Sequence, residues 1–123
     1  MNAVALKATL LTANVLNNAI GVAKKKGNAL VCLKAKDTLI KAKNTVNSYI
    51  DRDEIYNVQT PQIFKYIDLM KAFDKAYKAN FYGTDESMLV KKLGKKINIA
   101  EGSVLNFKIT TKSDVQIFKD LIK

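Results

Sequence analysis

The sequence lacks histidine and tryptophan, and its 123 residues include one cysteine, one proline and one arginine. The absence of histidine excludes Ser-His-Asp and Cys-His catalytic groups and most zinc sites. A single cysteine excludes an internal disulfide and is typical of a reducing compartment. Because Cys32 lies in the apolar run of residues 29–33 (ALVCL), we expect a buried thiol and not a nucleophile.

The remaining composition is that of an ordinary folded protein. Hydrophobic residues make up 48% of the chain and charged residues 26%. A chain of this length supports one hydrophobic core, and no repeat, low-complexity tract or interdomain linker interrupts it. We therefore predict a single unit over residues 1–123.

The net charge of +10 comes mostly from lysine, because Arg52 is the sole arginine. Such an excess attracts anionic partners, including nucleic acid, anionic lipid and phosphorylated metabolites. The lysine clusters at residues 24–26, 91–92 and 95–96, however, lie at predicted helix ends, where solvated lysines are common. Since neither arginines nor interleaved aromatic residues accompany these clusters, nucleic-acid binding is a minor alternative.

The amino-terminal segment predicts no association with a membrane. Residues 1–22 are fairly apolar but are interrupted early by Lys7 and late by Asn14, Asn17 and Asn18, which makes them too polar to cross a bilayer. A secretory signal carries its positive charge before the apolar run, whereas the lysine triplet here follows it. We expect a cytoplasmic protein.

The first half of the chain predicts a helix, a strand and an arm. Apolar residues at helical spacing begin after Thr12 or Asn14 and end at Gly27, and residues 29–33 then read as a buried strand. A helix followed promptly by a buried strand indicates an α/β crossover. Residues 36–57 read instead as a protruding β-hairpin with little core of its own, which we expect to pack on a partner.

The second half predicts three helices and two strands. Thr60 and Pro61 supply a hydroxyl cap and a first-turn proline for one helix, with an apolar stripe running from Phe64 to Tyr77. A second helix starts at Thr84 and ends at Gly94. Residues 96–100 and 104–109 read as strands, and a last helix follows a cap at Thr111 or Ser113.

Three features could hold a phosphate group. Arg52 supplies a planar guanidinium, although the acidic residues around it make an ordinary surface ion pair equally plausible. The predicted helix starts at Thr60 and Thr84 offer free N–H groups, although most such threonines are only caps. Strand alternation places Lys108 on one face with Asn106 and Thr110, where an exposed lysine would also be unremarkable.

Four blocks of the sequence together resemble the carboxy-terminal half of 2-C-methyl-D-erythritol 4-phosphate cytidylyltransferase. They are residues 52–64 (RDEIYNVQTPQIF), 84–87 (TDES), 106–110 (NFKIT) and the pair Asp37-Thr38. The blocks occur in the family's order and near its spacing, and the correspondence runs from about Leu10 to the end of the chain. Ribitol 5-phosphate cytidylyltransferase is a related family, but residues 84–90 are more similar to the methylerythritol enzymes.

This resemblance implies an α/β fold: a partial doubly wound, Rossmann-like nucleotidyltransferase sheet with a protruding β-hairpin arm. It implies transfer of CMP from CTP to a sugar-alcohol phosphate in isoprenoid biosynthesis, with release of pyrophosphate. The positions that match the family's acceptor-phosphate residues are Thr38, Arg52, Thr60, Thr84 and Lys108. In the family the arm crosses to the neighbouring subunit, so the resemblance also implies a homodimer with a shared site, or pairing with a complementary amino-terminal half.

The family's nucleotide-binding features have no counterpart in these 123 residues. No G-x-G is present for a CTP triphosphate loop, Val4 stands where the family has a metal-binding aspartate, and Leu105 stands where an acidic residue is frequent. We therefore expect no catalytic residue, metal site or cofactor in this chain, with Mg²⁺ expected only in a complete family site. The chain alone should be inactive, and the alternative function is a non-catalytic interaction module that pairs through its arm and an exposed sheet edge.

Overall fold

The computed structural model describes residues 2–4 and 11–123, which form a mixed sheet with helices on both faces. The four-stranded sheet has the order β1 (Asn2–Val4), β5 (Tyr56–Lys65), β2 (Asn28–Lys34) and β6 (Ile99–Glu101). Strands β1 and β2 both run antiparallel to β5, whereas β2 and β6 are parallel. The helix–strand crossover predicted for the first half of the chain is confirmed.

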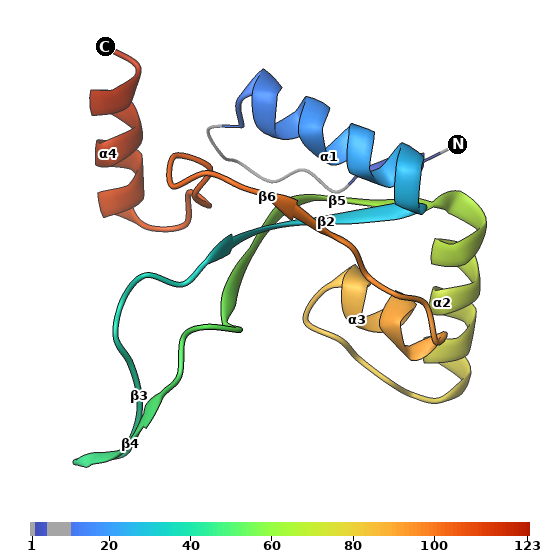
Figure 1. The fold of residues 1–123 in the computed structure, drawn as a ribbon, viewed down its shortest axis with the longest axis horizontal. Coiled ribbons are helices and arrows are strands. Elements are labelled where there is room, and N and C mark those ends of the chain that lie inside the picture. Colours follow the sequence, from blue (N-terminus) through green and yellow to red (C-terminus); the bar gives the residue numbers. More distant parts are fainter. Residues whose placement is uncertain (1, 5–10) are drawn as a thin grey trace.

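Helix α1 (Ala13–Lys26) covers one face of this sheet (Figure 1). The Thr12 hydroxyl accepts a hydrogen bond from the Val15 amide, and Gly27 ends the helix in the left-handed conformation. The helix buries small or β-branched side chains against the sheet, so its backbone lies close to the strands. The resulting hydrophobic cluster contains Val15, Ala19, Ala23, Ala29, Val31, Ile63 and Ala100.

Helices α2 (Tyr66–Lys78) and α3 (Glu86–Lys92) enclose a second hydrophobic cluster. It contains Phe64, Ala72, Leu89 and Val90. Ile63 belongs to the first cluster and Phe64 to the second, as expected for neighbouring residues of a strand whose side chains point to opposite faces. Residues 61–64 of β5 are therefore buried from both sides, as in a doubly wound sheet.

The helix predicted to start at Thr60-Pro61 is wrong. Both residues lie in β5, joined by a cis peptide bond, and α2 begins only at Tyr66. Pairing with β1 and β2 and the burial of Ile63 and Phe64 outweigh the local cap signal.

The orientation of α2 also differs from the one expected for its apolar stripe. Ala72 is buried, whereas Phe73 is 45% and Tyr77 85% exposed. The small side chains of α2 thus face the protein and many of its large side chains face outward.

The predicted arm is confirmed as a separate two-stranded sheet of β3 (Leu39–Ala42) and β4 (Val46–Ile50), which projects away from the main sheet (Figure 1). Its base is closed by a hydrogen bond of 2.9 Å from the Ala35 amide to the Ile55 carbonyl. Most of its residues are exposed, including Tyr49 at 74%. The arm therefore has almost no hydrophobic core of its own.

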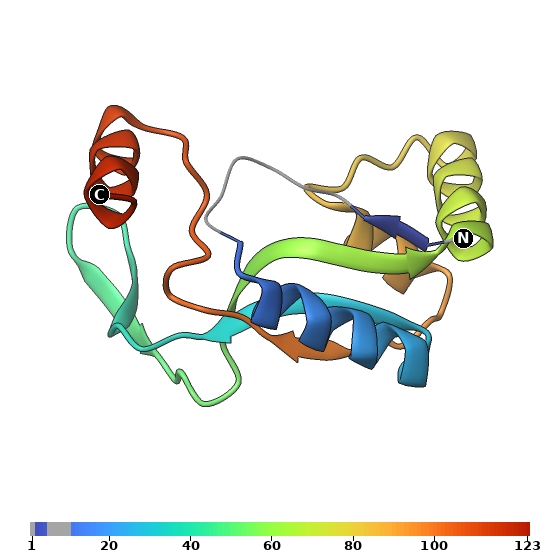
Figure 2. The same cartoon turned by 90° about the horizontal axis from the view of Figure 1, so that it is seen from above.

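The carboxy-terminal region departs from the prediction in one place. Residues 104–109 form a turn and irregular chain with a single bridge at Lys108, and not a strand. Helix α4 (Lys112–Leu121) then follows a capping box of Thr111 and Asp114 and stands apart from the sheet (Figure 2), with no buried residue. Among the described residues, no helix is long and apolar enough to cross a bilayer.

Candidate functional site

A cavity of about 210 Å³ gathers three of the five predicted phosphate-binding residues. Thr60 comes from β5, Thr84 from the loop before α3, and Lys108 from the segment before α4. The other lining residues are Val58, Gln59, Gln62 and Asp85. Hydroxyl, amide and ammonium groups from three separate segments thus surround one hollow.

A bulge in β5 places Thr60 at this cavity. Leu30 pairs with Gln62 and Cys32 with Val58, so Val31 alone stands opposite three residues of β5. Bulges redirect side chains and leave backbone groups unpaired. Pro61, which has no N–H to donate, is tolerated in β5 because it lies within this bulge.

Side chains from the segment after β6 bind the bulge. The Asn106 side chain donates a hydrogen bond of 2.7 Å from Nδ2 to the Thr60 carbonyl. Gln59 donates from Nε2 to the Ser103 carbonyl at 2.8 Å and accepts from the Ser103 amide at 3.2 Å. A side chain at Gly102 would begin 2.0 Å from Oε1 of Gln59, so this contact requires glycine.

The loop before α3 differs from the prediction that Thr84 starts the helix. The cap is Asp85, whose carboxylate accepts hydrogen bonds from the Met88 amide at 3.1 Å and the Ser87 hydroxyl at 2.6 Å. Thr84 precedes the cap, and its hydroxyl contacts Met88 Sδ at 3.1 Å. The expectation of two helix-terminal anion sites is therefore wrong: Thr60 lies in a strand, and a carboxylate already occupies the start of α3.

Lys108 provides the positive charge of the cavity. Its side chain is exposed, whereas Asn106 is buried, so the strand alternation predicted to place them on one face is absent. Lys108 lines the same hollow as Thr60 and Thr84, and Asp85 is the one acidic residue among the lining residues. Anion binding here would depend on Lys108 and on neutral donors.

Arg52 and Thr38 flank the two strands of the arm and are not among the residues that line this cavity. Arg52 is exposed, and its guanidinium donates to the Lys36 carbonyl across the base of the arm. Thr38 is exposed immediately before β3. Within one chain, the structure brings together three of the predicted residues and separates the other two.

Three polar residues of the site were not predicted as functional. Gln59 and Gln62 flank the Thr60-Pro61 pair, and Gln62 accepts a hydrogen bond from the Ser87 amide at 3.3 Å. Asn106 is 3% exposed. The sequence feature that could have indicated Gln59 and Gln62 is their position as polar residues within a run that includes the apolar residues Val58, Ile63 and Phe64.

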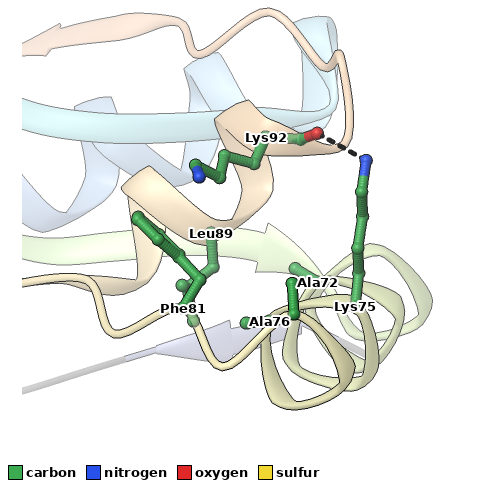
Figure 3. Close-up of a pocket in the computed structure, with 7 residues that line it drawn as sticks. Ala72, Lys75, Ala76, Phe81, Leu89 and Lys92 are labelled. Carbon is green, nitrogen blue, oxygen red and sulfur yellow. Dashed lines mark hydrogen bonds between the residues drawn. The ribbon is translucent and has the colours of Figure 1, made fainter.

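A second, larger cavity of about 360 Å³ lies between α2 and α3 (Figure 3). Alanines of α2 line it together with Phe81 and Leu89, and Lys75 Nζ donates to the Lys92 carbonyl at 2.9 Å. The Lys92 ammonium lies 3.5 Å from the centroid of the Phe81 ring. No hydroxyl side chain lines this apolar cavity, so it does not match the predicted phosphate site.

The residues that the structure describes contain no cluster of three potential metal ligands. Val4, the position where the sequence predicts that a metal ligand is missing, belongs to β1 by its backbone. Its side chain lies outside the described part of the structure. In the cavity, Asp85 is the only carboxylate, and it is already engaged as a helix cap. The described residues that line this cavity therefore supply no carboxylate that is free to bind Mg²⁺.

Known proteins resemble this chain over most of its length. A family profile for 2-C-methyl-D-erythritol 4-phosphate cytidylyltransferase matches residues 5–123. The enzyme of that name from Clostridioides difficile is 38% identical over 109 residues, which are 88% of this chain and 46% of the relative. Its counterpart from Lysinibacillus sphaericus is 39% identical over 106 residues, covering 85% and 46%.

A solved structure agrees with these sequence matches. The crystal structure of the Thermus thermophilus enzyme superposes with a TM-score of 0.86 at 26% identity, covering 91% of this chain and 56% of that one. The predicted partial nucleotidyltransferase sheet is thereby confirmed. The chain spans about half the length of the curated relatives it matches, and it belongs to the 2-C-methyl-D-erythritol 4-phosphate cytidylyltransferase family.

Proposed function

We propose that this chain is the carboxy-terminal, acceptor-binding half of a cytidylyltransferase that transfers CMP from CTP to a sugar-alcohol phosphate. The observation that carries the proposal is the convergence of Thr60, Thr84 and Lys108 on one cavity. The order of the sequence blocks supports the carboxy-terminal placement.

The cavity suits a phosphate monoester through complementary groups. Two threonine hydroxyls and the Lys108 ammonium can donate to phosphate oxygens, while Gln59 and Gln62 line the same hollow. A phosphate dianion needs more positive charge than one lysine provides, particularly beside Asp85. We propose that Arg52 and Thr38 of a second copy's arm complete the site, since both are exposed on the projecting hairpin.

The proposal assigns binding, and not chemistry, to these 123 residues. Nucleotidyl transfer depends on positioning the triphosphate and on stabilising its developing charge, usually with a divalent metal. The sequence contains no G-x-G, and the described carboxylates do not form a metal site. We expect no CMP transfer by this chain alone.

Isothermal calorimetry with 2-C-methyl-D-erythritol 4-phosphate tests the proposal. Weak binding should be detected, and both Lys108→Gln and Arg52→Ala should reduce affinity at least tenfold, about 1.4 kcal/mol for a charged hydrogen bond. The matched control is Lys119→Gln on α4, which removes the same charge outside the cavity and should leave affinity within twofold. Absence of binding by the folded chain would contradict the proposal.

The second candidate function is a non-catalytic interaction module. It is favoured by the exposed apolar side chains of α2, the arm and α4, including Tyr77 at 85% and Ile122 at 58% exposure. Strand β1 also forms an edge of the main sheet. A folded chain that sediments as a monodisperse monomer would argue against pairing with further copies.

A further inference from the structure

A polar hollow of about 210 Å³ at the far end of β5 brings four lysines together. Lys26 ends α1, Lys65 ends β5, and Lys95 and Lys96 precede β6. These residues come from three distant segments, so their convergence is a product of the fold and not of a basic run in the sequence. Asp68 of α2 is the single acidic residue that lines the hollow.

Hydrogen bonds of the buried Asn28 side chain hold the backbone of this hollow in place. Asn28 is 7% exposed and donates from Nδ2 to the Lys96 carbonyl at 2.7 Å. Its Oδ1 accepts from the Asn98 amide and from Asn98 Nδ2, both at 2.9 Å. Asn98 Nδ2 also lies 3.4 Å from the Lys26 carbonyl. Asn28 therefore fixes the segment that carries Lys95 and Lys96 beside the end of α1.

The charges of the hollow are poorly balanced. Lys95 Nζ lies 3.5 Å from Asp68 Oδ1, which leaves three lysines without a carboxylate among the lining residues. Lys65 is also the residue preceding α2, and its side chain makes no cap hydrogen bond to the helix. A β-carbon at Gly27 would lie 3.9 Å from Lys65 Nζ, so this ammonium lies beside the end of α1. Four lysines therefore line one small volume, which lies between the end of α1, whose carbonyl groups favour cations, and the start of α2, which favours anions.

We propose that this hollow, which we call the lysine hollow, binds a compact oligophosphate such as inorganic triphosphate. Several ammonium groups match an anion that carries several charges within a short length. The volume lies below the roughly 300–1,000 Å³ of sites for larger ligands, which favours a compact anion. Arg52, the only arginine, is not among its lining residues, so a base-reading nucleic-acid site is not supported.

The lysine hollow is separate from the cavity at Thr60. Lys65 follows Thr60 along β5, and a separation of five positions spans roughly 16 Å of extended strand. The hollow lies at the amino ends of the parallel strands β2 and β6, whereas Ser103, which is hydrogen-bonded to Gln59, follows the carboxyl end of β6. Its occupancy is therefore independent of the proposed acceptor site.

Calorimetric titration with inorganic triphosphate at low salt tests this proposal. The double variant Lys65→Gln/Lys96→Gln should lose at least tenfold in affinity. The control Lys112→Gln/Lys119→Gln removes the same charge from α4 and should change affinity by less than twofold. Lys108→Gln should leave triphosphate binding unchanged while weakening sugar-alcohol phosphate binding, so the two proposals can fail independently.

Several outcomes would overturn the proposal. The first is that the wild-type chain does not bind triphosphate. The second is that both double variants lose the same affinity for triphosphate, which would indicate attraction to the net charge alone. Loss of triphosphate binding in Lys108→Gln would show that the anion binds in the cavity at Thr60 and not in the lysine hollow. Binding of a short DNA duplex that the Lys65/Lys96 substitutions abolish, without triphosphate binding, would replace the proposal with nucleic-acid binding. Each comparison requires that the variant has the same urea midpoint as the wild type within error. If the glutamine variant is unstable, Lys65→Arg/Lys96→Arg replaces it in the test. This variant retains the charge and should bind triphosphate as the wild type does.

Discussion

At the scale of single residues, two neighbouring side chains after β6 have different roles: Lys108 lines the cavity at Thr60, whereas Asn106 is buried and is hydrogen-bonded to the bulge in β5. Lys108 could be predicted as a cavity residue because the sequence blocks around it resemble a family, although the strand used to orient it is absent. Asn106, two positions earlier, is instead buried and donates a hydrogen bond to the Thr60 carbonyl. The sequence could not distinguish them, since the difference depends on a bulge in β5 that forms only against β2.

Substitution of Asn106 tests the importance of that bulge. Asn106→Ala leaves the Thr60 carbonyl without this donor and should lower the free energy of unfolding by about 1–3 kcal/mol. Urea denaturation followed by fluorescence or circular dichroism measures the change. The control Asn44→Ala, at the exposed end of the arm, should be neutral within about 0.5 kcal/mol. Equal stabilities of the two variants would show that the hydrogen bond does not support the bulge.

At the scale of elements, local signals identified α1, α4 and the hairpin but misplaced α2. The two ends of α1, at Thr12 and Gly27, could be predicted because the geometry of a helix cap depends only on residues that are neighbours in the sequence. Thr60-Pro61 carries an equally good local signal, yet both residues lie in β5, because the residues that flank them, Val58 and Gln62, pair with β2. The sequence is informative where an element depends on its own residues and fails where strand pairing decides.

Two glycines, one within α1 and one at its end, should respond oppositely to alanine. Gly21 is exposed within the helix, and a β-carbon there would meet no heavy atom within 4 Å, so Gly21→Ala should stabilise the protein by about 0.4–1 kcal/mol. Gly27 has φ of +98°, so Gly27→Ala should destabilise it by about 1–2 kcal/mol. Thermal unfolding of both variants provides the measurement. Shifts of the same sign would contradict the assigned caps.

The start of α4 should depend on pH. Backbone hydrogen bonds from Thr110 and Thr111 lower the pKa of Asp114 below its ordinary value. A lowered native pKa gives stabilisation that is present above the ordinary value and is lost as pH falls through the native pKa, below about pH 4. Amide NMR signals of residues 110–118 should therefore shift on acidification. In Asp114→Asn, which does not titrate, that shift should disappear; its persistence would assign the transition to another group.

At the scale of the whole molecule, the chain combines a two-faced sheet with two elements that extend from it, the arm and α4. The family resemblance made this architecture predictable. The outward orientation of the large side chains of α2 was not predictable, because an apolar stripe in the sequence does not show which face of the helix packs on the sheet. Exposed apolar surface on several elements is typical of a chain that associates.

Removal of the arm should separate folding from association. Replacing residues 37–53 with a short glycine linker retains the Ala35–Ile55 hydrogen bond at the base of the arm and both hydrophobic clusters. We expect the shortened chain to remain folded, to sediment as a smaller species than wild type, and to bind sugar-alcohol phosphate at least tenfold more weakly. Unchanged sedimentation would exclude the arm as the contact between copies.

The pairing of β2 with β6 also has a consequence for how the chain folds during synthesis. Leu30 pairs with Ile99, so this part of the sheet cannot close until most of the sequence has left the ribosome. Until then β2 presents an open, apolar edge containing Val31 and Cys32, which other chains could pair with. Strand β6 is only three residues long, yet it is the segment whose arrival ends that exposure.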